Sequence, residues 1–130
     1  TVICTHVVSE LLRCGTPPFI EGGGIKYTTK SHYDHNERVE YMCQPYYTME
    51  GDPYKTCING EWTGHMRCLK PCIAKEDIFR QHNITLESNN RKYFTHDEYI
   101  EFKCTTGVPV GEMALHQRCN SGVLHLPTCQ

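Results

Sequence analysis

Eight of the nine cysteines of this chain fall into two tandem sets of four. The two sets share one spacing: a long first interval (29 and 32 positions), a middle interval (14 and 15) and a short last one (11 and 10). The chain is therefore a repeat of two small units, and an apolar core of that size is marginal without covalent cross-links. The sets are Cys14, Cys43, Cys57, Cys68 and Cys72, Cys104, Cys119, Cys129.

The cysteine content indicates an oxidising compartment, so we expect a secreted, extracellular protein. Four cysteines permit three pairings, and their spacing does not choose among them. The formal net charge is −2, so the chain lacks the basic stripe that a nucleic-acid partner requires. No run approaches the roughly 18 apolar residues of a membrane span, and we expect no membrane insertion.

Zinc is the rival explanation for clustered cysteine and histidine. Structural zinc sites use close ligand pairs such as C-x-x-C. Cys68 and Cys72 are the one close cysteine pair, and they straddle the boundary between the two units. His32 and His35 lie in a polar stretch that is typical of a solvated loop. The sequence therefore predicts no metal site and no cofactor.

Alternating side-chain character predicts strands at equivalent places in the two units, over residues 38–43 and 99–104, just before each second cysteine. The Asn-Gly pair at 59–60 and the Ser-Gly pair at 121–122 predict tight turns. Residues 74–81 are the one segment compatible with a helix.

The stretch from Cys57 to Trp62, running on to Cys68 and preceded by residues 39–43, resembles the complement control protein (sushi) module. This resemblance implies a small, disulfide-rich, all-β fold in which the first cysteine pairs with the third and the second with the fourth. It also implies that Trp62 packs over the disulfides, and Leu124 takes its position in the second unit. The implied pairs are Cys14–Cys57, Cys43–Cys68, Cys72–Cys119 and Cys104–Cys129.

The resemblance divides the chain into two tandem modules. Residues 14–68 form the first module, and residues 72–129 form a C-terminal, leucine-type second module. The linker 69–71 is short and contains a proline, so we expect an elongated rod. We expect residues 1–13 to be the tail of a preceding module or a linker. Cys4 is unpaired by count, and three explanations fit: its partner lies in a preceding module, it bridges two copies of the chain, or it takes up a small thiol.

The ending at 122–129, the Gln-Pro-Tyr-Tyr run at 44–47 and the Asn-Ile-Thr-Leu run at 83–86 resemble the last two modules of the complement factor H family. The resemblance implies a non-enzymatic pair of modules that binds the thioester-containing fragment of the third complement component. It further implies binding of sialylated or sulfated host glycans, and capture by pathogen surface proteins.

The resemblance assigns contact with the complement fragment to Gln44, and Tyr47 lies beside Gln44 on the same expected edge. Arg91, part of a basic pair with Lys92, is the third predicted contact residue. A weak polyanion site is expected at Arg91, Lys92, Lys103 and Arg118. It is weak because residues 72–129 hold six basic against seven acidic side chains. Glu87 and Ser88 also stand where the family pattern has an arginine and a tryptophan.

Asn83 begins an N-x-[ST] sequon and is the predicted glycosylation site.

Catalysis is not expected, because the chain has no G-x-S-x-G motif and its cysteines serve as bridges. Two other non-catalytic functions are compatible with sushi modules. One is that of a sushi pair from a complement serine protease. The other is a carrier role like that of the coagulation factor XIII B subunit, whose late modules share the leucine-type ending and a strand similar to residues 98–102.

Overall fold

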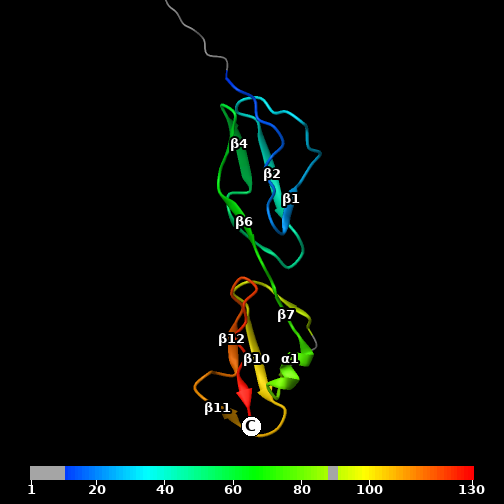
Figure 1. Ribbon diagram of the computed structural model, residues 1–130, viewed down its shortest axis with the longest axis vertical. Coiled ribbons are helices and arrows are strands. Elements are labelled where there is room, and N and C mark those ends of the chain that lie inside the picture. The colour runs from blue at the N-terminus through cyan, green and yellow to red at the C-terminus, as the bar shows by residue number, and fades with distance from the viewer. Residues whose placement is uncertain (1–10, 88–90) are drawn as a thin grey trace, which may run out of the picture. The chain divides into compact units, whose positions relative to one another are not determined.

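The computed structural model describes residues 11–87 and 91–130. Cys4 and Ser88 lie outside these residues. By its contacts the chain forms two compact units. The first contains the described residues up to Cys43 together with Met49–Arg67, and the second contains Gln44–Thr48 and Cys68–Gln130. Both are built of short strands, with one short helix among the described residues (Figure 1).

The first unit is organised by a four-stranded antiparallel sheet with the order β1-β2-β4-β5. The predicted strand at 38–43 is β2, and its alternating pattern buries Val39 and Tyr41 while their neighbours face outward. A further pair, β3 and β6, forms a two-stranded sheet. Thr48 of β3 and Cys68 and Leu69 of β6 are counted with the second unit. The strands between residues 11 and 69 are β1 (Gly23–Ile25), β2 (Arg38–Cys43), β3 (Thr48–Gly51), β4 (Tyr54–Ile58), β5 (Glu61–Thr63) and β6 (Met66–Leu69).

The core of the first unit packs around the bridge between Cys14 and Cys57, whose Cα atoms are 5.9 Å apart. Tyr41 is 1% exposed, and its hydroxyl donates a 2.7 Å hydrogen bond to the carbonyl oxygen of Pro18. Burial raises the pKa of Tyr41 to about 12, because the phenolate would lose its hydration.

Trp62 is half-buried and meets the ring of Tyr33 edge to face, with centroids 5.1 Å apart. Its indole nitrogen Nε1 donates a 3.2 Å hydrogen bond to the carbonyl oxygen of Gly15. The residue pairs directly with Cys57 across β4 and β5. Trp62 is therefore part of the packing around the Cys14–Cys57 bridge, as the resemblance implied.

The second unit centres on β10, which lies between β8 and β12. The predicted strand at 99–104 is β10, and its inward side chains Ile100 and Phe102 are each 1% exposed. Two smaller ladders, β7 with β9 and β11 with β13, complete the unit. The strands are β7 (Cys72–Ile73), β8 (Ile84–Leu86), β9 (Tyr93–Phe94), β10 (Tyr99–Cys104), β11 (Pro109–Val110), β12 (His116–Arg118) and β13 (Thr128–Cys129).

The helix α1 spans Glu76–Gln81, two residues fewer than predicted. Six residues are too few for a helix to be stable alone, so packing must hold it. Phe79 supplies that packing: it is 4% exposed and lies edge to face against Phe102 at 5.2 Å. The acidic Glu76 and Asp77 in its first turn also suit the helix dipole. No described helix has the length and apolar character to cross a membrane.

Both predicted tight turns are present. Asn59 and Gly60 have φ values of 48° and 90°, and Ser121 and Gly122 have 50° and 84°. Positive φ at both central residues is the requirement of the tight hairpin turn, which explains the Asn-Gly and Ser-Gly pairs.

Disulfides join the first cysteine to the third in both sets, and the second to the fourth in the second set. Cys43 and Cys68 are also disulfide-bonded. The small, disulfide-rich, all-β fold predicted from the sequence is thereby confirmed.

Candidate functional site

The turn at residues 44–47 follows β2 directly and carries two of the predicted contact residues. The amide of Tyr47 donates a 3.0 Å hydrogen bond to the carbonyl oxygen of Gln44, which closes the turn. Tyr46 has φ of 71° at its apex. Gln44 is exposed and Tyr47 is half-buried, so the turn presents the glutamine amide to solvent.

Within the second unit the ring of Tyr46 stacks on that of Tyr93, with centroids 4.8 Å apart and planes at 23°. This stack holds the turn against β9, the strand that follows Arg91. The predicted contact residues Gln44, Tyr47 and Arg91 thus belong to one compact unit. Sequence reasoning missed Tyr46 as the connecting residue, because no pattern in the sequence links it to an aromatic residue 47 positions away.

Arg91 is tied to its own unit by several contacts. Its guanidinium forms a two-point ion pair with the carboxylate of Glu98, with Nη2 and Oε1 at 2.9 Å. Nη2 also donates a 3.2 Å hydrogen bond to the carbonyl oxygen of Tyr93, and the guanidinium lies 4.6 Å from the centroid of the Phe94 ring. The hydrogen bond from Arg91 holds the pKa of Glu98 below its usual range. Arg91 therefore has a structural role beside any contact role.

A groove of about 530 Å³ runs beside Arg91 in the second unit, and we call it the basic groove. Four cations and two carboxylates line it, so it carries a local positive excess that the whole module lacks. Its charged lining residues are Lys75, Glu76, Asp77, Arg80, Arg91 and Lys92.

The structure brings together two of the four predicted polyanion residues, Arg91 and Lys92, at the basic groove. Lys103 and Arg118 are not among its lining residues: Lys103 lies on β10, and Arg118 lies on β12 with its Nε 3.4 Å from Asp97. Sequence reasoning missed Lys75 and Arg80. These residues line the groove because α1 lies beside the segment that precedes β9, and no spacing in the sequence indicated that α1 and this segment are neighbours.

Asn83 is half-buried, with φ of 58°, between α1 and β8. Its amide nitrogen Nδ2 donates to the carbonyl oxygen of Thr106 at 2.7 Å and to the hydroxyl of that residue at 3.1 Å. Nδ2 is the atom to which a sugar would be attached. Glycosylation of this sequon therefore competes with existing hydrogen bonds.

Among residues 11–87 and 91–130, no group of three or more His, Cys, Asp or Glu side chains could hold a metal ion.

Comparison with known proteins identifies the class. The family model Sushi repeat (SCR repeat) matches residues 14–68. Human complement factor H-related protein 2 is 35% identical over 121 residues, which cover 91% of this chain and 45% of that protein. Mouse complement factor H is 36% identical over 121 residues, covering 90% of this chain and 10% of that protein.

Human coagulation factor XIII B chain is 32% identical over 134 residues, covering 98% of this chain and 20% of that protein. The chain thus spans less than half the length of each of these relatives. Residues 14–68 match the sushi repeat, and the cysteine spacing, bridges and strand pattern give the chain the sushi fold. Within that class, the chain is similar to complement factor H, to a factor H-related protein and to the factor XIII B chain.

Proposed function

We propose that this chain is a non-catalytic complement-recognition segment of a secreted plasma protein, and that it binds the thioester-containing fragment of the third complement component. The observation that carries the proposal is the stack of Tyr46 on Tyr93. It joins the exposed Gln44 turn to the Arg91 segment within one unit, so one ligand surface could contact both.

The neighbouring basic groove gives the proposal a second component. Its four cations suit sulfate or carboxylate groups, with which arginine forms two-point hydrogen bonds. Sialylated or sulfated host glycans are the proposed ligands. Binding should be weak, because Glu98 already pairs with Arg91 and two carboxylates lie in the groove. It should also weaken further as salt rises.

The test is surface plasmon resonance with the thioester-containing fragment immobilised, at several salt concentrations. We expect saturable binding that Gln44→Ala weakens by about 2- to 10-fold, the effect of losing one hydrogen bond. Tyr46→Ala should weaken it further, because the turn loses its anchor. Gln81→Ala, which changes an exposed glutamine at the end of α1, is the matched control. Absence of saturable binding by a chain with intact disulfides would refute the proposal.

The similarity to the factor XIII B chain keeps one alternative open, a carrier role in assembling another plasma protein. The similarity covers nearly the whole chain. In that case the complement fragment should not bind at any salt concentration, and the same chain should co-purify with a zymogen from plasma.

A further inference from the structure

The two modules can be compared at the position of the tryptophan. Trp62 lies five positions after Cys57, and Leu124 lies five positions after Cys119. The glycines that precede them, Gly60 and Gly122, each lie three positions after the same cysteines. These matched positions allow one module to serve as a reference for the other.

The surroundings of the two glycines confirm that the sites are equivalent. A Cβ placed on Gly60 would meet the side chain of Leu12 at 3.1 Å, and one on Gly122 would meet Lys70 at 3.0 Å. Leu12 and Lys70 each lie two positions before the first cysteine of their module. Both modules therefore fold the tight turn against the same backbone segment.

In the first module the indole of Trp62 fills this site and donates to the carbonyl oxygen of Gly15. Leucine is smaller and has no such donor. In the second module the site instead contains a pocket of about 400 Å³, at the small end of the range for ligand pockets. Its walls include Leu124, Phe79 from α1, and Ile73. Ile73 follows the first cysteine of its module, as Gly15 does in the first module.

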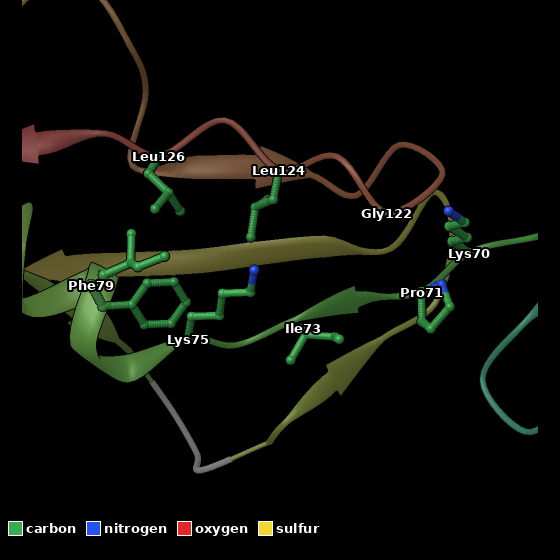
Figure 2. A pocket seen from close by; sticks show the side chains of 9 residues that line it. Lys70, Pro71, Ile73, Lys75, Phe79, Gly122, Leu124 and Leu126 are labelled. Atoms are coloured by element: carbon green, nitrogen blue, oxygen red, sulfur yellow. The ribbon is translucent and has the colours of Figure 1, made fainter.

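The charged side chains that line this pocket are all positive. Figure 2 shows Lys75 extending from the start of α1 toward Leu124, with Phe79 beside it. None of the nine lining residues, all of them within the described part of the chain, carries a carboxylate. A mainly apolar pocket with an ammonium group at its rim is complementary to a compact ring that carries an anion.

We propose that this pocket, called here the leucine pocket, binds a small aromatic carboxylate whose ring takes the position that the indole of Trp62 fills in the first module. The ring would pack between Leu124, Phe79 and Ile73, and the carboxylate would pair with Lys75. The leucine pocket shares Ile73 and Lys75 with the basic groove, and it is distinct from the surface at Gln44 and from the complement-fragment interaction.

The test uses the full chain and indole-3-propionate, followed by amide chemical shifts in nitrogen-15 correlation spectra and by calorimetry. We expect one saturable site, with shifts centred on residues 73–79 and 122–126. The neutral indole-3-propionamide should bind several-fold more weakly. Octanoate, which has the same charge without a ring, should also bind more weakly. Preference for octanoate, or equal affinity for the neutral analogue, would overturn the proposal.

Two variants address the pocket directly. Leu124→Trp should fill it as Trp62 fills the first module, and should weaken binding about tenfold or more. Ile73→Glu places a carboxylate on the wall of the pocket. Because Ile73 is 45% exposed, this variant should fold even if Leu124→Trp does not. Val108→Glu is the matched control, since Val108 is 65% exposed and does not line the pocket. Undiminished binding by either folded pocket variant would refute the site.

Discussion

The side-chain nitrogen of Asn83 donates a 2.7 Å hydrogen bond to the carbonyl oxygen of Thr106, 23 positions later in the chain. The backbone contributes too, because the amide of Thr105 donates to the carbonyl oxygen of Asn83 at 3.0 Å. One asparagine thus fastens the start of β8 to the loop that follows Cys104. Its φ of 58° suits asparagine better than most residues.

Asn83→Ala should lower the free energy of unfolding by about 1 to 3 kcal/mol, because it removes the hydrogen bonds from Asn83 Nδ2 to Thr106 and Cys129 and leaves alanine in a left-handed conformation. Chemical denaturation followed by circular dichroism measures this. Thr85→Ala removes the sequon and keeps the Asn83 amide, so it is the control. If glycosylated wild-type protein is as stable as Thr85→Ala, glycosylation and these hydrogen bonds do not compete.

Tyr41 should ionise late, because its pKa is raised to about 12. In the unfolded chain a tyrosine ionises near pH 10. The folded state therefore retains a proton that the unfolded state loses, so stability is full below pH 10 and falls as pH rises from about 10 to 12. Absorbance of phenolate at 295 nm should show a late phase that Tyr41→Phe removes. Tyr27→Phe, at a site 70% exposed, should leave that phase intact.

The ion pair between Arg91 and Glu98 should make the second unit sensitive to acid. The pKa of Glu98 is lowered, so its stabilising effect is present above the unfolded pKa of about 4.3 and is lost as pH falls through the folded value. Solvent screening limits the effect at neutral pH to about 1 kcal/mol. Glu98→Gln should therefore be less stable than wild type at pH 7, with a difference that shrinks at pH 3. A constant difference, or an equal one in the exposed control Glu112→Gln, would contradict this role.

Gly51→Ala should destabilise the first unit by about 1 to 3 kcal/mol. Gly51 has φ of 95°, and a Cβ there would lie 2.3 Å from the carbonyl oxygen of His65, a backbone atom that cannot rotate away. Gly24→Ala is the matched control, because a Cβ on Gly24 meets nothing within 4 Å. Thermal unfolding of the two variants should separate them, and equal midpoints would contradict the steric argument.

Strands and turns were predicted correctly where the residues that determine them lie within one short segment of the sequence. The alternation at 38–43 and 99–104 gave β2 and β10 with their observed bounds, because an alternating strand buries one face. The turns at 59–60 and 121–122 followed from residues that tolerate positive φ. The disulfide pairing needed the family resemblance, since spacing left three choices.

The candidate site was less predictable, because it depends on contacts between distant segments. Gln44 was predicted from the family resemblance and Arg91 from its charge. The stack that joins their segments involves Tyr46 and Tyr93, and no sequence pattern indicated that these two residues pair. The basic groove likewise required α1 to lie near residues 91 and 92. Lys103 and Arg118 were grouped with Arg91 by charge alone, and they do not line the groove.

The single tryptophan of the chain lies in the first unit, where its ring meets Tyr33 and its indole N–H is hydrogen-bonded to Gly15. Intrinsic fluorescence excited at the red edge of the tryptophan band therefore reports on that unit alone. The second unit has leucine at the matching position and contributes no tryptophan fluorescence. A fluorescence melting curve would therefore record unfolding of the first unit and would not detect unfolding of the second. Leu124→Trp combined with Trp62→Phe would move the fluorescent reporter to the second unit.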